Sequence, residues 1–357
     1  MSKIEDTKNS FKMYYKEVPL SDVAAAYTGK QLNKSAMSNN GLYAVINGGI
    51  DASGYTNNYN EDKNTITISQ GGASAGFVNW NSEKIWVGAH CYAIHPKDKD
   101  VDNRFLYFVL KEKQDELMQS KQGAGIPGLN RSNINRLLIP LPHIKVQEDI
   151  VKILDSFTNL IDALNEELSL RQKQFEYYRE KLLTFDEEPT SIFKFVKVLR
   201  GKRLTTKELS DNAKYPVYHG GTEPIGYYNE YNRDANTVMV INVGASAGTI
   251  GFCNQTFWSS DGCYCLSHNQ KIDNKFLYYS LLIREYKIKS QVRHAGIPTL
   301  DQKVIENIQL FIPSLAIQQS IVEKLDAFES LISSLKEEIA LRQKQYEYCR
   351  EKLLTFD

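Results

Sequence analysis

The chain lacks any apolar run long enough to cross a membrane. Its longest run, Phe105 to Leu110, is far shorter than the roughly 18 residues that a membrane helix requires. It also lacks net charge, since 43 basic residues balance 43 acidic ones among 357. The polar, mixed-charge N-terminus does not fit a signal peptide, and five cysteines, an odd number, indicate free thiols. We therefore expect a globular chain of two or three domains in the reducing cytoplasm.

A tandem repeat accounts for almost the whole sequence. Residues 144–186 and 315–357 are identical at 26 of 43 positions when they are aligned at an offset of 171. Further upstream the offset becomes 172, which aligns the Gly-Ala-Ser-Ala-Gly run at 72–76 with the same run at 244–248. The upstream portions otherwise share only scattered turn and apolar residues. The conserved segments are therefore expected to do the same thing twice, and the upstream portions to do different things.

The two conserved segments are expected to be long helices. Neither contains Gly or Pro, and their apolar residues recur at spacings of four and three, which is typical of a coiled-coil seam. The seam residues are Leu154, Phe157, Ile161, Leu164 and Leu168 in the first copy and Leu325, Phe328, Ile332, Leu335 and Ile339 in the second. At 1.5 Å per residue each helix is roughly 60 Å long. We predict that the two pack as an intramolecular antiparallel coiled coil; two separate core helices are the alternative.

The upstream portions predict an α+β fold. Residues 64–69 and 237–243 are rich in β-branched and apolar residues and are expected to be strands. Residues 102–119 and 273–290 are each expected to form one amphipathic helix that an Asp caps. The predicted order is a globular domain (1–143), a long helix (144–186), a linker (187–190), a second globular domain (191–314) and a second long helix (315–357).

Charge is distributed unevenly between these parts. The first long helix carries a net charge of −3 and the second −2, and Glu187 and Glu188 lie in the linker. The two globular domains together therefore carry about +7. Their loops combine Lys and Arg with Tyr, Asn, Gln and His, which are the residue types that contact phosphates and base edges.

The sequence gives little support for a catalytic motif. The two Gly-x-Ser-x-Gly runs match a hydrolase nucleophile elbow, but that elbow needs a following helix, whereas residues 77–80 and 249–252 resemble strands. Cys263 and Cys265 are too close in sequence for a typical structural zinc site. No phosphate-binding loop, amino-methyltransferase motif or nuclease pattern is present. We expect a non-catalytic chain with no metal; a hydrolase is a distant alternative.

A set of short motifs occurs once in each repeat. These are Gly125-Ile126-Pro127, Ile139-Pro140-Leu141-Pro142, Gln147 and residues 150–155 in the first copy, and Gly296-Ile297-Pro298, Ile312-Pro313, Gln318 and residues 321–326 in the second. Together with the duplicated architecture they resemble the specificity subunit of type I DNA restriction-modification enzymes. The second copy departs from the pattern where Ser314-Leu315 stand in place of Leu141-Pro142. The resemblance covers nearly the whole chain.

The resemblance implies two target recognition domains that each read half of a split sequence in double-stranded DNA. It also implies two methylation subunits as partners, which bind S-adenosylmethionine, and restriction subunits that use ATP and Mg²⁺. This chain itself is expected to bind no cofactor. The alternatives are a specificity subunit of a type II combined methylase–nuclease, and a coiled-coil adaptor whose domains bind protein.

The candidate DNA contacts lie in the predicted loops of both domains. They are Lys30, Gln31, Asn47, Ser74, Lys121, Gln122 and Arg131 in the first domain, and Lys202, Arg203, His219, Ser246, Arg293 and His294 in the second. Lys121-Gln122 and Arg293-His294 are favoured because both pairs precede a Gly-Ile-Pro turn, where the chain leaves a globular domain and approaches the long helix.

Overall fold

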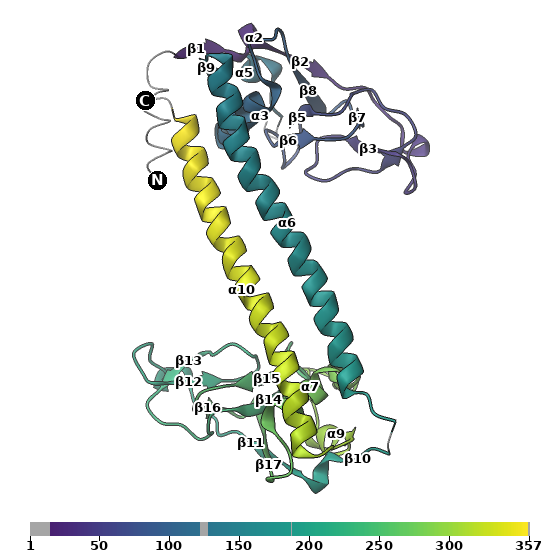
Figure 1. The fold of residues 1–357 in the computed structure, drawn as a ribbon, viewed down its shortest axis with the longest axis vertical. Helices are drawn as coiled ribbons and strands as arrows, with labels where there is room; N and C mark the ends of the chain where they lie inside the picture. Colours follow the sequence, from purple (N-terminus) through teal and green to yellow (C-terminus); the bar gives the residue numbers. More distant parts are fainter. Residues whose placement is uncertain (1–14, 122–127, 187, 356–357) are drawn as a thin grey trace. The chain divides into compact units, whose positions relative to one another are not determined.

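The computed structural model describes residues 15–121, 128–186 and 188–355 (Figure 1). The chain divides into two compact units. Unit 1 comprises residues 1–164 and 338–357, and unit 2 comprises residues 165–337. Each unit therefore holds one globular domain, the first part of one long helix and the last part of the other. None of the helices described is long and apolar enough to cross a membrane.

The globular part of unit 1 is built on a four-stranded antiparallel sheet, ordered β2-β8-β5-β6, and a three-stranded sheet, ordered β4-β3-β7. A further antiparallel pair joins β1 to β9. The strands are β1 (Tyr15–Pro19), β2 (Ala24–Thr28), β3 (Tyr43–Ile46), β4 (Tyr55–Thr56), β5 (Thr65–Ser69), β6 (Val78–Asn81), β7 (Ile85–Val87), β8 (Cys91–Pro96) and β9 (Leu138–Pro142). The helices are α2 (Leu20–Val23), η1 (Lys34–Ala36), α3 (Asn103–Glu112), α4 (Gln114–Gln119) and α5 (Arg131–Arg136).

The globular part of unit 2 repeats this plan, with a sheet ordered β11-β17-β14-β15 and another ordered β13-β12-β16. Strands β10 and β18 form the additional pair. The strands are β10 (Thr190–Ser191), β11 (Val196–Arg200), β12 (Tyr215–Tyr218), β13 (Gly226–Tyr228), β14 (Thr237–Ile241), β15 (Ile250–Cys253), β16 (Trp258–Ser259), β17 (Cys263–His268) and β18 (Gln309–Leu310). The helices are η2 (Ile192–Lys194), η3 (Thr206–Glu208), α7 (Asn274–Leu282), α8 (Glu285–Lys289) and α9 (Gln302–Glu306).

The strand predictions at 64–69 and 237–243 are confirmed by β5 and β14, which are central in their sheets. The predicted caps are confirmed as well, because Asp102 accepts from the amide of Phe105 at 2.7 Å and Asp273 from that of Phe276 at 2.9 Å. Both buried strands carry β-branched residues, which pack well on a pleated surface.

The prediction of one continuous helix over 102–119 and over 273–290 is wrong. Each segment is two helices, α3 with α4 and α7 with α8. The side chain of Gln114 accepts a hydrogen bond from the amide of Val78 at 3.0 Å, and Glu285 accepts one from Ile250 at the same distance. Both residues begin the second helix. The break thus lets that helix satisfy the first amide of strand β6 or β15.

The long helices are α6 (Ile144–Leu183) and α10 (Leu315–Leu354). In unit 1, the start of α6 shares a buried cluster with Cys349 and Leu353 near the end of α10. In unit 2, Phe175 and Tyr178 near the end of α6 lie 6.5 and 5.5 Å, between ring centroids, from Phe328 near the start of α10. Within each unit the two helix segments are therefore antiparallel, and the predicted seam residues on them are buried or half-buried.

A buried glutamine joins each globular domain to its long helix. Gln147 is fully buried; its Oε1 accepts from the amide of Asp102 at 2.9 Å, and its Nε2 donates to the carbonyls of Asp100 and Pro142. Gln318 makes the same three bonds in unit 2, with Asp273, Lys271 and Pro313.

The bonds of Gln318 show that the second repeat does not depart from the first in the way that the sequence suggested, with Ser314-Leu315 in place of Leu141-Pro142. The structure places Pro313, not Ser314-Leu315, in the role of Pro142, since each proline carbonyl receives the glutamine amide at 2.8 Å. The turn that leads into the long helix is thus built in the same way in both units.

Candidate nucleic-acid interface

In each unit a group of loops meets at one end of the sheets. We name them loop A (28–31 and 200–203), loop B (47–49 and 219–221), loop C (70–76 and 242–248), loop D (88–90 and 260–262) and loop E (128–131 and 292–300). Hydrogen bonds connect these loops to one another or to the adjoining strands: backbone bonds join loops C, D and E and tie loop A to β7 or β16, and a side chain of loop B binds the backbone of loop D. The loops are far apart in the sequence, so the fold alone brings them together.

Loop D is the centre of the group in unit 1. The amide of Gly88 donates to the carbonyl of Ile46 at 2.8 Å. The amide of His90 donates to Oδ1 of Asn47 in loop B at 3.1 Å. The carbonyl of His90 accepts from the amide of Gln70 in loop C at 2.9 Å. The carbonyl of Gln70 in turn accepts from the amide of Leu129 in loop E at 2.7 Å.

Unit 2 reproduces these bonds residue for residue. The amide of Gly262 donates to Nδ1 of His219 at 3.3 Å, and its carbonyl accepts from the amide of Asn242 at 3.2 Å. The carbonyl of Asn242 accepts from Leu300 at 2.8 Å. The backbone scaffold is thus the same in both units, whereas the side chains on it differ: Asn47 against His219, Gln70 against Asn242, and His90 against Gly262.

Loop A is fixed in both units by a tryptophan. The indole of Trp86 donates to the carbonyl of Lys30 at 2.9 Å, and that of Trp258 to the carbonyl of Lys202 at 2.8 Å. The side chains of Lys30, Gln31, Lys202 and Arg203 are exposed. Gly29 leaves no room for a side chain, since a Cβ there would lie 2.3 Å from the carbonyl oxygens of Val87 and Gly88. The loop therefore holds its backbone rigidly and presents its polar side chains to solvent.

The serine candidates lie inside tight turns of loop C. Ser74 and Ser246 are half-buried, and their carbonyls accept from the amides of Phe77 and Thr249. Strands β6 and β15 follow, as predicted, so neither serine precedes the helix that a nucleophile elbow needs. This geometry favours a structural turn at both serines.

The remaining basic candidates are held by polar partners. Nζ of Lys121 donates to the carbonyl of Ala73 at 2.9 Å, and Nη2 of Arg131 donates to Oγ1 of Thr28 at 2.7 Å. Arg293 forms an ion pair with Asp301 at 2.5 Å, and its side chain is 71% exposed. His294 is exposed next to it, and Gln122 lies outside the described residues. The described candidates therefore all belong to, or border, the loop group.

Sequence reasoning missed several residues of this interface. Gln70, His90, Asn242 and Asp261 lie on loops C and D, and the signal for them was the offset of 172, which pairs 70 with 242 and 90 with 262. A pair of asparagines was missed as well. The side-chain amide of Asn60 donates to the carbonyl of Val87 and accepts from its backbone N–H. Asn232 makes the same two bonds with Ser259. These asparagines fix the residue that directly precedes loop D in each unit.

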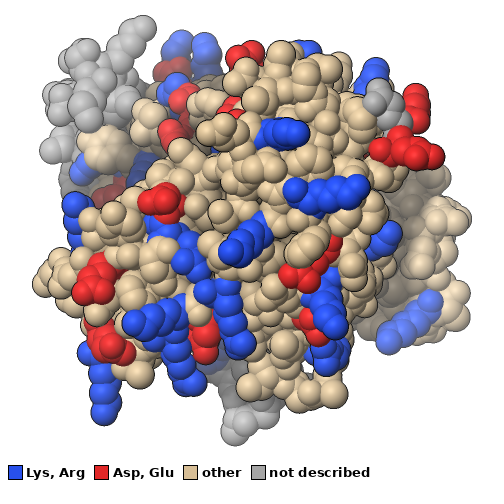
Figure 2. Space-filling view, turned by 90° about the horizontal axis from the view of Figure 1, so that it is seen from below, with Lys and Arg blue, Asp and Glu red and all other residues tan. Residues whose placement is uncertain are grey.

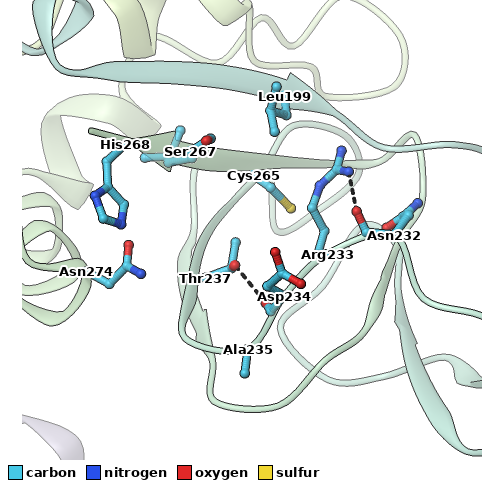
Figure 3. A pocket seen from close by; sticks show the side chains of 11 residues that line it. Leu199, Asn232, Arg233, Asp234, Ala235, Thr237, Cys265, Ser267, His268 and Asn274 are labelled. Atoms are coloured by element: carbon cyan, nitrogen blue, oxygen red, sulfur yellow. Dashed lines mark hydrogen bonds between the residues drawn. The ribbon is translucent and has the colours of Figure 1, made fainter. Parts of the chain in front are cut away.

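A cavity of about 240 Å³ lies beside this support in unit 2 (Figure 3). Nη1 of Arg233 donates to the carbonyl of Asn232 at 2.6 Å, and its Nη2 donates to the carbonyl of Arg200, next to loop A. Oγ1 of Thr237 donates to the carbonyl of Asp234 at 2.8 Å. These polar side chains bond to backbone, which makes the cavity part of the scaffold that holds loop A.

The predicted free thiols are confirmed, since none of the five cysteines forms a disulfide, and all five are buried. Burial raises the pKa of the Cys91 thiol to about 12. A hydrogen bond between the thiols of Cys263 and Cys265 raises the pKa of Cys263 and lowers that of Cys265. Both cysteines lie within β17, where they pack with Met239 and Ile241 in the core.

Basic side chains are prominent on the molecular surface. On the face drawn in Figure 2, Lys and Arg side chains gather in a band, with Asp and Glu interspersed among them. Such a mixed but predominantly basic surface fits a partner with a regular array of negative charges.

Comparison with known proteins agrees with this arrangement. The family model described as "Type I restriction modification DNA specificity domain" matches residues 14–170 and again 188–341. A Haemophilus influenzae chain named as a type I restriction enzyme specificity subunit is 30% identical over 334 residues, which cover 85% of each chain. A Mycoplasma pneumoniae chain named as a type I specificity subunit is 27% identical and covers 87% of this chain and 88% of its own.

A solved structure shares the fold. The crystal structure of a type I restriction-modification S subunit from M. genitalium has a TM-score of 0.77 and 22% identity, with 96% of each chain covered. The fold defines a protein of two similar α+β domains, each joined to long helices, and the family model describes each domain as a DNA specificity domain. The chain belongs to the family of type I restriction-modification DNA specificity subunits.

Proposed function

We propose that this chain reads a bipartite, asymmetric DNA target as the non-catalytic specificity subunit of a type I restriction-modification complex, with one half-site for each unit. The observation that carries the proposal is the duplicated loop scaffold. The same backbone hydrogen bonds recur in both units, but the side chains at positions such as 47 and 219 differ. A conserved scaffold suits a common backbone geometry of DNA, and divergent side chains suit different base sequences.

The long helices would act as the spacer between the half-sites. Each begins in one unit and ends in the other, and in each unit their segments pack antiparallel. A coiled coil that continues along both helices would hold the gap between half-sites at a fixed length. This proposal leads to a target with a fixed number of unspecified base pairs.

The exposed faces of the two helices would dock two identical methylation subunits. Leu160, Leu170 and Tyr177 of α6 are exposed apolar residues, at 41, 57 and 59%. Their equivalents in α10, Leu331, Leu341 and Tyr348, are exposed as well. The same exposed apolar residues thus occur on both helices, as two copies of one partner require. S-adenosylmethionine, ATP and Mg²⁺ would bind to the partner subunits, with the restriction subunits attached through the methylation subunits.

Domain exchange tests this function. The chain is expressed with its methylation subunits in cells, and the methylated sequence is read by methylome sequencing. Replacing residues 191–314 with a foreign counterpart should change one half-site and leave the other half-site and the gap unchanged. A change in both half-sites would contradict the assignment of one half-site to each unit.

A binding assay separates DNA recognition from a protein-adaptor role. Affinity for duplex DNA should fall steeply as salt rises, because phosphate contacts release bound counterions. An adaptor that binds protein alone would show no sequence preference among duplexes at any salt concentration.

A further inference from the structure

One contact between loop B and loop D occurs in both units with different side chains. In unit 1, Oδ1 of Asn47 accepts the amide of His90 at 3.1 Å. In unit 2, Nδ1 of His219 accepts the amide of Gly262 at 3.3 Å. Residues 47 and 90 align with residues 219 and 262 at the offset of 172. In both units, therefore, an acceptor atom of the loop B side chain binds a backbone amide of loop D.

Glycines of loop D fix both side chains in place. A Cβ on Gly88 would lie 2.2 Å from Oδ1 of Asn47, and a Cβ on Gly262 would lie 2.8 Å from Nδ1 of His219. Real Cβ atoms do not approach this closely, so each glycine makes room for the side chain opposite it. The two side chains are therefore held tightly against loop D, while Asn47 stays half-buried and the His219 side chain is 42% exposed.

The use of the acceptor determines what each side chain can offer to a ligand. With its oxygen bonded to His90, Asn47 offers the N–H donors of Nδ2. Nδ1 of His219 accepts from Gly262 at 3.3 Å and also lies 3.3 Å from Oδ1 of Asp261. The neutral ring that accepts at Nδ1 carries its proton on Nε2, and the charged ring that pairs with Asp261 carries one there as well, so in both forms His219 offers an Nε2–H donor. Two different residue types thus present the same hydrogen-bonding group at the same place in the scaffold.

We propose that Asn47 and His219 are equivalent specificity-determining residues, each of which donates an N–H to an acceptor on a base edge in the major groove. The acceptors available there are N7 of a purine, O6 of guanine and O4 of thymine, whereas cytosine presents only an amino donor. The bond from His90 uses one lone pair of the Asn47 oxygen, and we assign the base contact to the Nδ2 donor. This inference rests on the proposed function, because it requires that each unit reads a half-site.

The substitution Asn47→Asp tests this donor role with almost no change in shape. One carboxylate oxygen still accepts the amide of His90, and the other replaces the N–H donor with an acceptor. Methylome sequencing of cells that carry the variant with its partner subunits should show one altered base pair in one half-site. Preference should move toward the amino group of cytosine or adenine by on the order of 10- to 100-fold.

Asn57→Asp is the matched control. Oδ1 of Asn57 accepts the amide of Leu42 at 3.3 Å, so the substitution makes the same change in charge at a similar contact. Leu42 precedes strand β3, whereas Asn47 follows it, so this contact lies at the far end of the strand. The control variant should methylate the original sequence.

The outcomes separate this inference from the proposed function. If the unaltered chain directs methylation to a defined bipartite site and Asn47→Asp keeps the same preference, the inference is wrong and the function stands. If the unaltered chain directs no sequence-specific methylation, the proposed function itself fails.

A second measurement covers the case in which Asn47→Asp does not fold. The unaltered chain and Asn47→Ala, each in complex with its methylation subunits, are titrated with duplexes that lack single N7, O6 or O4 acceptors. Loss of one particular acceptor should lower the affinity of the unaltered chain and leave the affinity of Asn47→Ala unchanged. The inference is overturned if every acceptor affects both proteins equally.

Discussion

Arg293 and Lys202 are both exposed basic residues of the loop group, but the free chain holds them differently. Arg293 pairs with Asp301, which also caps helix α9 by accepting from the amide of Lys303. An exposed pair of this kind contributes only about 0–1 kcal/mol, so a base contact can replace it. The backbone of Lys202 is fixed by Trp258, while its ammonium group lies 6.0 Å from the ring of that tryptophan.

We expect the two residues to differ when they are replaced. Arg293→Ala should cost about 1–3 kcal/mol of affinity for the cognate site and relax preference at one position, as loss of a bidentate guanine contact would. Lys202→Ala should weaken binding similarly on all sequences and reduce the salt slope by about 1, as loss of a phosphate contact would. Titrations against the cognate site and single-base variants at two salt concentrations measure both effects.

Unchanged affinity and preference in both Arg293→Ala and Lys202→Ala would mean that the DNA-facing surface lies elsewhere in the two units. The assignment to the family would not be affected by that result.

The long helices and the loops differ in how far sequence predicts them. Periodicity, the absence of Gly and Pro, and Asp caps are local signals, and they predicted α6, α10 and the starts of α3 and α7. The break between α3 and α4 was missed because it depends on a hydrogen bond that the side chain of Gln114 accepts from the amide of Val78, a strand residue distant in the chain. The convergence of the loops was missed for the same reason, since their bonds join residues that are distant in the chain.

The helices themselves provide a prediction about stability and assembly. Leu325 is fully buried within unit 2, whereas Leu331, on the same helix, is 39% exposed. Leu325→Ala should lower the free energy of unfolding by about 2–5 kcal/mol, because it leaves a cavity. Leu331→Ala should change it by less than about 0.5 kcal/mol.

For binding of the methylation subunit, the larger effect is expected from Leu331→Ala. Leu331→Ala should weaken binding of the methylation subunit, since Leu331 is one of the exposed apolar residues repeated on both helices, while its stability stays near that of the unaltered chain. Denaturant unfolding and a pull-down with the methylation subunit measure the two properties separately. A large loss of stability in Leu331→Ala would show that its exposed side chain packs within the chain itself.

At the scale of the whole molecule, the proposed spacer makes the gap length adjustable. Inserting one heptad at equivalent points in α6 and α10 should lengthen the unspecified gap by about three base pairs, since seven residues add about 10 Å. Both half-sites should keep their bases, although the added twist can lower activity. Methylated sites with the original gap, or with altered half-site bases, would contradict the spacer role.

The exchange of helix ends between the units has a consequence for how the chain is made. The core of unit 1 contains Ile150 and Leu154 together with Cys349 and Leu353, which follow about 200 residues later. At roughly 5–20 residues per second, the ribosome delivers that second pair on the order of 10–40 s after the first. The first domain to be translated is thus the last to be completed. Until then the part of α6 that packs against Cys349 and Leu353 in the finished chain stays uncovered.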